Sequence, residues 1–398
     1  MIRLGRILSF LKTTNFCRDK FGWIHKWYHP LPNPPSLWKI PAVRSYSTMG
    51  DSSIDLTAAE IFEILTGFQR SQILFAASEL GVFDALAGDG EQKKTATQLA
   101  TELSTDVDAM ERLLNSCVSL HLLSKSLDPD KKGQYSNTEA SSKYLTAGSK
   151  SSMRGYIHFA KLYNYPLMGN LDHAVREGKN QHVRTFGATS SELYENFYAD
   201  EDGVMTVVNG MQGLAPLASK AVVTAFDLST FKTACDFGGG SGALAYEMSR
   251  TYPSISIKVL ELPPVVKVSN HFKPDDAGKL NVEFLAGDFF VDELPEADLY
   301  VFSMIFHNWQ DDKIIRLLQK VHSTLKPGGA ILIAECIYND DKTGPVDPAQ
   351  RCMLMLAVTD GKERSGSEYR LLAEKSGFSD VKVKYTDALH DVVLARKS

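Results

Sequence analysis

A glycine-rich stretch is the part of this sequence whose residue types point most directly to chemistry. Residues 236–242 read DFGGGSG, and the glycines follow directly on the short run 233–237. Glycine lets a backbone turn sharply and approach a ligand closely, and open α/β sheets bind ligands at the carboxyl ends of their strands. We therefore expect Gly238 and Gly240 to contact a nucleotide-type cofactor. The stretch also fits the loose G-x-G-x-x-A fingerprint, so alone it does not separate a nicotinamide dinucleotide from S-adenosylmethionine.

Acidic residues at successive strand ends separate the two cofactors. Asp236 lies two residues before the first glycine, where a carboxylate would favour the amino-acid end of S-adenosylmethionine and oppose a pyrophosphate. Glu261 ends the expected second strand and would accept both ribose hydroxyls of either cofactor. Gly287, Asp288 and Phe289 end the third, where the carboxylate would accept from the adenine amino group and the ring would pack on adenine. Each acid alone is equally well explained as a strand-end cap, but together they favour S-adenosylmethionine.

A candidate general base follows the expected fourth strand. His307 stands in Phe306-His307-Asn308-Trp309, at the same carboxyl edge of the sheet. A lone histidine is usually structural, but this position would face the methyl donor. A phenol with a pKa near about 10 is mostly protonated at neutral pH, so O-methylation needs a base. Glu335, at the end of the next strand, and Glu363 would fix the histidine tautomer and stabilise the imidazolium.

The elements that must position these residues alternate in type. The pattern predicts strands over 233–237, 255–260, 282–285, 298–304 and 330–334, helices over 243–250, 311–325 and 367–376 and after Pro264, and a closing hairpin of 381–385 with 391–395. Such alternation predicts a parallel sheet with helices on both faces. The turn Lys326-Pro327-Gly328-Gly329 and the hairpin are similar to the layout of class I methyltransferases. We therefore expect an α/β, Rossmann-like domain over residues 216–398.

A helical domain is expected over residues 49–215. Apolar residues recur at helical spacing from Leu56 to Glu79, and Gly81 follows as a stop. Two shorter helices, divided at 104–106, and a wing at 133–136 resemble a winged helix-turn-helix. Residues 95–145 hold five basic and seven acidic residues, a balance that argues against DNA binding. We expect packing or dimerisation instead, with helix 56–79 as a candidate dimer surface. The aromatic residues of 150–215 fit either a ligand pocket or a core.

Residues 1–48 differ from the rest in charge. They carry eight lysine or arginine residues and one acid, Asp19, although the whole chain of 398 residues has a net charge of −5. Their basic, apolar start and the segment Arg44-Ser45-Tyr46-Ser47 resemble a mitochondrial presequence. The alternative is an upstream extension with Met49 as the working start. The expected location is therefore the mitochondrial matrix or the cytosol.

The remaining composition excludes several classes of protein. The overall negative charge disfavours a general nucleic-acid binder, and no apolar run approaches the roughly 20 residues of a membrane helix. The five cysteines are scattered and lack C-x-x-C spacing, so neither a disulfide framework nor a metal site is expected.

The chain after Met49 resembles the acetylserotonin O-methyltransferase group, relatives of the plant caffeate and flavonoid O-methyltransferases. The resembling stretches are 71–84, 174–181, the glycine-rich turn 236–242 and 296–300. The resemblance implies a small aromatic hydroxyl substrate, S-adenosylmethionine as cofactor and a homodimer formed through the N-terminal domain. It also implies that His307 is the base, Glu335 and Glu363 support it, and Tyr198, Glu261 and 287–289 contact the cofactor.

Three positions depart from the family pattern. Asn308 stands where the family usually has aspartate after the catalytic histidine, so a charge that would anchor a substrate donor is lost. Met304 replaces an arginine among the cofactor contacts of the vertebrate enzyme, and Ala215 replaces a tryptophan there. These changes leave two alternatives open: an active O-methyltransferase with an unnamed acceptor, or a cofactor-binding dimeric scaffold without turnover.

Overall fold

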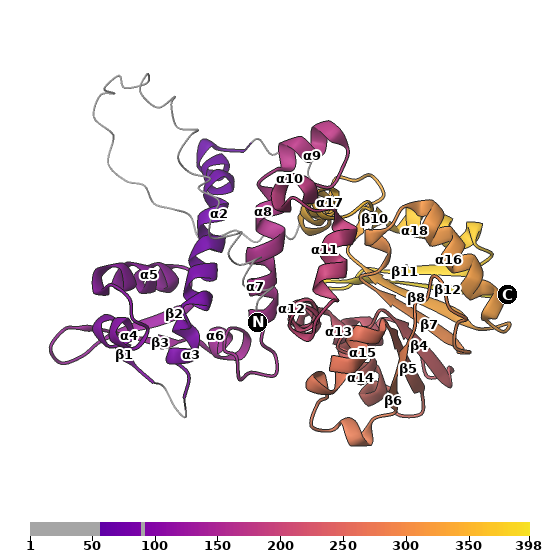
Figure 1. Ribbon diagram of the computed structural model, residues 1–398, viewed down its shortest axis with the longest axis horizontal. Helices are drawn as coiled ribbons and strands as arrows, with labels where there is room; N and C mark the ends of the chain where they lie inside the picture. Colours follow the sequence, from indigo (N-terminus) through magenta and orange to yellow (C-terminus); the bar gives the residue numbers. More distant parts are fainter. Residues whose placement is uncertain (1–55, 89–91) are drawn as a thin grey trace. The chain divides into compact units, whose positions relative to one another are not determined.

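The computed structural model describes residues 56–88 and 92–398. The presequence-like segment 1–48 and residues 49–55 lie outside this described part, so the expectations for them are not tested by it. Figure 1 shows the arrangement of the described elements.

A seven-stranded sheet forms the centre of the C-terminal half (Figure 1). Its strands are β4 (Thr233–Phe237), β5 (Ser256–Glu261), β6 (Val282–Ala286), β7 (Leu299–Ser303), β8 (Ala330–Glu335), β11 (Ser379–Lys384) and β12 (Asp391–Arg396). They lie in the order β11-β12-β8-β7-β4-β5-β6. The first five strands along the chain are mutually parallel, whereas β12 is antiparallel to β8 and to β11. The expected parallel sheet and closing hairpin are confirmed.

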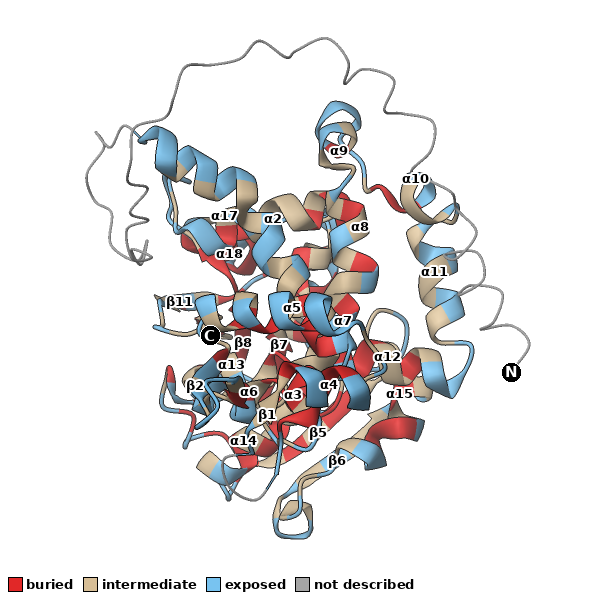
Figure 2. Ribbon diagram, turned by 90° about the vertical axis from the view of Figure 1, so that its left-hand side faces the viewer, coloured by how far each residue is buried: buried red, intermediate tan, exposed pale blue. Residues whose placement is uncertain are grey.

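Helices bury both faces of this sheet. On one face α16 (Asp311–Thr324) and α18 (Gly366–Lys375) pack with Phe237, Phe302 and Ile333, and on the other α13 (Ala215–Thr224) and α14 (Ala243–Thr251) pack with Val259, Val301 and Leu332. Because successive side chains of a strand point to opposite faces, β8 is apolar at nearly every position. All six of its residues are buried, and the buried residues follow the central strands in Figure 2.

The order of strands reverses between β4 and β7, which are neighbours in the sheet. One connection leaves β4 toward β5, and the chain returns past β6 to β7 on the other side of β4. The carboxyl ends of β4 and β7 therefore open a crevice, the usual ligand site of such sheets. The glycine-rich turn follows β4, and the short 3-10 turn η5 (Phe306–Asn308), which carries His307, follows β7.

The N-terminal part has the expected winged-helix form. Helix α2 (Ala58–Glu79) begins with a capping box formed by Thr57 and Glu60. It is followed by α3 (Val82–Ala85), β1 (Lys94–Thr95), α4 (Ala96–Glu102), α5 (Val107–Ser119), β2 (Leu123–Leu127), β3 (Gly133–Asn137) and α6 (Glu139–Tyr144). β3 pairs with both β2 and β1, so the expected wing is a three-stranded sheet.

Helix α2 has two different halves. Its C-terminal half enters the core through Phe75 and Ala77, with Ile73 and Leu74 packed beside them. Its N-terminal half exposes five large apolar side chains: Ile61, Phe62, Ile64, Leu65 and Phe68, between 53% and 67% accessible. Core packing therefore explains only the second half of the apolar pattern. Among the described residues, no helix is long and apolar enough to cross a membrane.

A set of helices joins the two parts. They are α7 (Arg154–Phe159), the π-helical η2 (Ala160–Asn164), α8 (Tyr165–Met168), α9 (Leu171–Glu177), α10 (His182–Phe186), α11 (Ser190–Phe197) and α12 (Glu201–Gln212). Later in the chain lie α15 (Pro263–Val268), the 3-10 turns η3 (Ser269–Phe272) and η4 (Ala277–Lys279), and α17 (Val346–Val358). The sequence pattern did not predict α17. Two short parallel strands, β9 (Ile337–Tyr338) and β10 (Arg364–Ser365), complete the fold.

Candidate active site

The glycine-rich turn after β4 forms a tight backbone cradle. Gly238, Gly240 and Gly242 all have positive φ, at 64°, 57° and 79°, a conformation that glycine adopts without steric penalty. Gly239 is confined as well, since a Cβ there would lie 2.5 Å from Oδ2 of Asp236. The backbone turns directly over the end of the strand, and any larger side chain would fill the space over Asp236.

Asp236 is a buried carboxyl group without a partner. Its side chain is 2% exposed, and neither of its oxygens makes a hydrogen bond. Burial, reinforced by the nearby Glu261 carboxylate, raises its pKa to about 7. Buried carboxyl groups are normally paired, so this orphaned group fits a site completed by a cationic ligand such as the ammonium group of S-adenosylmethionine.

Glu261 ends β5 and is held by the backbone on both oxygens. Oε1 accepts a hydrogen bond of 3.1 Å from the amide of Gly240, and Oε2 one of 2.7 Å from the amide of Leu262. Burial raises its pKa despite these bonds. The carboxylate is thereby fixed at the turn, with lone pairs remaining for two ribose hydroxyls.

Three further expected cofactor contacts, Gly287, Asp288 and Phe289, directly follow β6. The amide of Gly287 donates to the Glu261 carbonyl at 2.9 Å, which joins the end of β6 to the end of β5. Phe289 stacks on Phe237 with ring centroids 5.4 Å apart and an interplanar angle of 2°. The neighbouring Asp288 accepts from the Phe290 amide at 2.8 Å through Oδ1. Strand ends far apart in sequence thus converge on the glycine-rich turn.

Tyr198 reaches this region from the helical part of the chain. It follows α11 and packs with Val204 and Val208 of α12 against Val265 of α15, the helix that begins two residues after Glu261. Burial raises the pKa of its hydroxyl, and the Glu261 carboxylate raises it further. The structure therefore brings Tyr198 to the side of the sheet where Glu261 lies.

His307 lies in a buried ion pair at the neighbouring strand end. Its Nδ1 is 2.6 Å from Oε2 of Glu335, and the side chains are 8% and 0% exposed. Oε1 of Glu335 accepts the amides of Ile305 at 2.9 Å and Phe306 at 2.7 Å. The same carboxylate therefore holds both the imidazole and the amide end of its turn. Because a carboxylate only accepts, Nδ1 carries the proton and Nε2 is left as the basic nitrogen of a neutral ring.

Glu363 is the second carboxyl group beside this imidazole. Its Oε1 lies 3.6 Å from Nδ1, and the group is 2% exposed. Burial lowers the pKa of His307, but the charges of Glu335 and Glu363 outweigh it and raise that pKa to about 9. Burial raises the pKa of Glu363, whereas the His307 charge holds the pKa of Glu335 below its usual value. At neutral pH the structure favours an imidazolium paired with Glu335.

Two of the three departures from the family pattern lie in or beside this turn: Met304 precedes it and Asn308 is its last residue. Met304 has a φ of 57°, a left-handed conformation that is unusual for a residue with a side chain. Nδ2 of Asn308 donates to the carbonyls of Met304 at 3.1 Å and Ile305 at 3.3 Å. Its two amide hydrogens are thereby directed at its own turn, which leaves only Oδ1 to accept from an acceptor molecule.

A hydrogen-bonded chain near the base was not anticipated from the sequence. The Tyr163 hydroxyl lies 2.6 Å from Nε2 of His182, whose Nδ1 is 2.9 Å from Oδ1 of Asn180. Asn180 in turn donates to Asp360 at 2.9 Å, and Asp360 accepts from Gln310 through its carbonyl. The chain ties η2 and α10 to the segment that carries Glu363. No spacing in the sequence brings these residues together.

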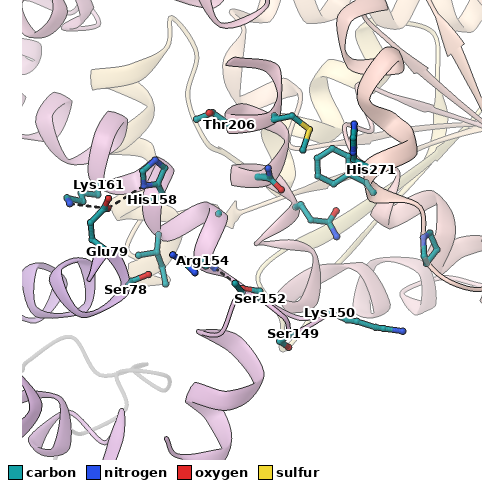
Figure 3. Close-up of a pocket in the computed structure, with 18 of the residues that line it drawn as sticks. Ser78, Glu79, Ser149, Lys150, Ser152, Arg154, His158, Lys161, Thr206 and His271 are labelled. Atoms are coloured by element: carbon teal, nitrogen blue, oxygen red, sulfur yellow. Dashed lines mark hydrogen bonds and ion pairs between the residues drawn. The ribbon is translucent and has the colours of Figure 1, made fainter. Parts of the chain in front are cut away.

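Figure 3 shows a cavity of about 720 Å³ whose lining includes no residue of the His307 turn. It is lined by α2, α7, α12 and η3, and Figure 3 shows Glu79 between Lys161 and His158 on its wall. Gln212 lines it and also accepts from the Ser241 hydroxyl of the glycine-rich turn. Because its charged groups are largely paired with each other and His307 does not line it, we assign it no catalytic role.

Two family models match this chain. Residues 168–379 match an O-methyltransferase domain, and residues 62–147 match an O-methyltransferase dimerisation domain. Acetylserotonin O-methyltransferase of Bos taurus is 41% identical over 84% of this chain and 96% of its own length. A human protein described as a probable bifunctional dTTP/UTP pyrophosphatase/methyltransferase is 37% identical over 85% of this chain, but this covers only 53% of its own length.

Solved structures agree with the sequence relatives. The crystal structure of human N-acetylserotonin methyltransferase in complex with S-adenosylmethionine superposes with a TM-score of 0.81 at 39% identity, covering 87% of this chain and 99% of the other. PigF with S-adenosylhomocysteine, at 24% identity and a TM-score of 0.74, shows the same fold.

The fold, the family models and the solved relatives together define a class I methyltransferase. The chain belongs to the O-methyltransferase family that joins a methyltransferase domain to a dimerisation domain. It is an S-adenosylmethionine-dependent O-methyltransferase of the acetylserotonin O-methyltransferase type.

Proposed function

We propose that this chain transfers the methyl group of S-adenosylmethionine to the hydroxyl of a small aromatic acceptor of the hydroxyindole or phenol class. The observation that carries this proposal is the buried His307–Glu335 pair, 2.6 Å apart, at the strand end next to the cofactor cradle. The names of the related acetylserotonin O-methyltransferases support a hydroxyindole as the first acceptor to test.

In this proposal His307 is the general base. Its Nδ1 is engaged by Glu335 and Glu363, so Nε2 of the neutral ring takes the hydroxyl proton of the acceptor. Glu335 then stabilises the imidazolium that forms, because its carboxylate already accepts a hydrogen bond from Nδ1. When bound, S-adenosylmethionine supplies the electrophilic methyl group and a positive charge. Asn308 offers Oδ1 to a donor group of the acceptor.

The cofactor is held by residues that the strands and α11 bring together. Asp236 would pair with its ammonium group, Glu261 with its ribose hydroxyls and Asp288 with its adenine amino group, because each offers a carboxylate to a donor. The other residues that we assign to this site are Gly238, Gly240, Gly287, Phe289, Tyr198 and Met304. The unpartnered oxygens of Asp236 support the assignment, since a buried carboxylate without a partner is unfavourable.

A panel of hydroxyindoles and phenols with a radiolabelled methyl donor tests the proposed reaction. We expect turnover on at least one acceptor, and a fall of about 10²- to 10⁴-fold in kcat for His307→Ala. Calorimetry should show nearly unchanged S-adenosylmethionine binding in that variant, because the cradle does not include His307. His322→Ala is the matched control, since that histidine lies at the far end of α16.

Two results would contradict the proposal. Cofactor binding without turnover on the whole panel would favour a dimeric scaffold, the alternative that Asn308, Met304 and Ala215 suggested. Undiminished turnover in His307→Ala would exclude the assigned base.

We further propose a homodimer formed through the exposed half of α2. Five large apolar side chains are exposed there within two turns, and burying each in an interface would contribute about 1.5–3 kcal/mol. Phe68→Asp should therefore raise the dimer dissociation constant by about 100-fold or more, measured by sedimentation equilibrium. Val291→Asp, at another exposed apolar residue, is the control. An unchanged dissociation constant in Phe68→Asp would exclude this surface.

The compartment, mitochondrial matrix or cytosol, depends on how residues 1–48 are processed. Separating mitochondrial from cytosolic fractions and sequencing the N-terminus in each tests this. A cleaved presequence predicts a mitochondrial protein that begins near residue 49, whereas a start at Met49 predicts a cytosolic one.

A further inference from the structure

Arg364 is a buried cation that the proposed reaction does not use. Its side chain is 1% exposed, which makes it the largest of the fully buried side chains in the described part of the chain. It follows Glu363 directly and lies in β10, opposite Ile337 of β9. A buried guanidinium is unfavourable unless its donors are satisfied, so its partners should show what holds it there.

The partners of Arg364 are concentrated on the turn that carries His307. Nη1 donates to the Phe306 carbonyl at 2.9 Å, and Nη2 donates to the Trp309 carbonyl at 2.7 Å. Nη1 also donates to the Lys362 carbonyl at 3.0 Å, in its own segment. Nε and Nη2 share Oδ1 of Asp311, at 2.9 and 2.7 Å. One side chain therefore joins the segment of Glu363 to both sides of His307.

The two ends of this turn are held by opposite charges. Glu335 accepts the amides of Ile305 and Phe306 at its beginning, and Arg364 donates to the carbonyls of Phe306 and Trp309. This arrangement follows the rule for helical turns, in which free amides attract anions and free carbonyls attract cations. The backbone of the turn itself makes hydrogen bonds from the Asn308 amide to the Ile305 carbonyl and from the Trp309 amide to the Phe306 carbonyl, at 3.2 and 3.1 Å. The two charged side chains add the partners at its ends.

Close packing and backbone conformation also require that the turn be held. A Cβ at Gly361 would lie 2.2 Å from the His307 carbonyl and 2.5 Å from the Trp309 amide, so the 361–364 segment lies directly against the turn. The turn is entered through Met304 in a left-handed conformation, which persists only where its surroundings enforce it. A loosened contact between these segments would let the imidazole move relative to both glutamates.

We propose that Arg364 is a positioning residue of the methyl-transfer site, whose guanidinium clamps the carbonyl end of the 306–309 turn and thereby holds His307 against Glu335 and Glu363. The inference rests on the proposed role of His307 as the base. Lysine cannot replace arginine here, because a single ammonium cannot reach the Phe306 carbonyl, the Trp309 carbonyl and Asp311 in one plane.

Arg364→Lys is the main test, with two independent measurements. We expect kcat to fall by about 10- to 100-fold, as small misplacements of catalytic groups do, while the S-adenosylmethionine dissociation constant changes less than about threefold. Separately, ¹⁵N NMR of the histidine side chains, with His307 assigned by His307→Ala, should show its pKa displaced below the wild-type value. The pKa falls because looser contact with Glu335 and Glu363 removes the charges that raise it.

Two matched variants separate the clamp from general electrostatics. Asp311→Asn removes the counter-charge but keeps the bonds from Arg364 to both carbonyls, so kcat should stay within about threefold of wild type. Arg316→Lys alters an exposed arginine on α16, the helix that begins with Asp311, and should change neither kcat nor the pKa of His307. Arg364→Ala should lose more activity than Arg364→Lys and recover part of it in millimolar guanidinium, but not in sodium chloride of equal ionic strength.

Each remaining outcome would overturn the inference. Wild-type kcat and wild-type His307 titration in folded Arg364→Lys would show that the clamp does not position the base. An equal loss in Asp311→Asn would assign the effect to charge. Failure of both Arg364 variants to fold would assign the residue to fold stability alone. If the wild type turned over no acceptor, the proposed function would fail, whereas the NMR titration would still test the clamp.

Discussion

The two neighbouring strand ends of this site satisfy their buried charges in different ways. At the end of β4, Asp236 is buried with both oxygens unpartnered and a pKa raised to about 7. At the end of β7, His307 is equally buried, but Glu335 pairs with it and Arg364 closes the other end of its turn. The protein thus pairs His307 with its own side chains, but gives the Asp236 carboxyl group no hydrogen-bond partner.

The difference matches the two tasks of a group-transfer site. A binding corner must hold a charged ligand, and an unpaired buried carboxylate makes that ligand its partner, at the expense of stability when it is absent. A catalytic corner must keep one geometry before and during reaction, and internal pairing fixes it in advance. We therefore expect variants at the base to affect rate and its pH dependence, and variants at the cradle to affect affinity and stability.

Glu335→Gln should reduce kcat more than Asp236→Asn does. The backbone amides of Ile305 and Phe306 would still donate to the side-chain oxygen of the glutamine. Its NH₂ group would then face Nδ1 of His307, which favours the tautomer with the proton on Nε2. We expect kcat to fall by about 10- to 1000-fold, with cofactor affinity nearly unchanged.

The same variant should shift the pH profile in a defined direction. His307 must be neutral to act, and nearby carboxylates raise its pKa to about 9, so the wild-type rate should rise with pH toward that value. Removing one carboxylate lowers this pKa, so the remaining activity of Glu335→Gln should rise at lower pH. A profile that does not move would show that Glu335 does not control the base.

Asp236→Asn should weaken cofactor binding rather than catalysis. Loss of a charge-assisted hydrogen bond of about 1.5–3 kcal/mol corresponds to a roughly 10- to 150-fold weaker dissociation constant. We expect kcat at saturating S-adenosylmethionine to fall far less than this, as calorimetry and steady-state kinetics would show. Asp312→Asn, at an exposed ion pair, is the control.

Asp236→Asn should also stabilise the cofactor-free protein, by an amount that depends on pH. A carboxyl group with a pKa of about 7 when folded and about 4 when unfolded opposes folding increasingly as pH rises through that interval, by up to about 4 kcal/mol above pH 7. Asparagine removes this effect, so Tm without cofactor should rise at pH 8 and change little at pH 4. Lower stability of Asp236→Asn at pH 8 would indicate that the carboxylate has a partner in the free protein.

Removal of divalent metal ions by a chelator should have the smallest effect on activity. Ligand atoms of His307, Glu335 and Glu363 lie within 4.8 Å of one another, a spacing that could hold a cation. The direct contact between Nδ1 and Glu335 already satisfies the imidazole, so we expect activity within about twofold after EDTA treatment and dialysis. A loss restored by a divalent cation would mean that the base corner is not complete without metal.

Much of the framework follows from the sequence because it depends on local patterns. The strand at 233–237 matches β4 at both ends, and the helices expected at 243–250 and 311–325 differ from α14 and α16 by one residue. Glycine spacing and an acid at each strand end predict a cradle there, and the structure brings those strand ends to one edge, as parallel strands do. Glu335 was expected beside His307 for the same reason, whereas the supporting role of Glu363 was implied by the family resemblance.

Only the tertiary structure shows the contacts that distant segments of the chain make near these strand ends. Arg364 and the Tyr163–His182–Asn180–Asp360 chain contact their partners across many residues of sequence, and no periodicity encodes such contacts. Periodicity also could not divide α2 into a core half and an exposed half, because an apolar helical pattern is the same whether it faces its own chain or a second copy. The sequence by itself predicted which strand ends carry chemistry, because local spacing marks them. Folding alone determined that Asp236 has no hydrogen-bond partner while Glu335 and Arg364 hold the turn of His307, because those contacts join distant segments.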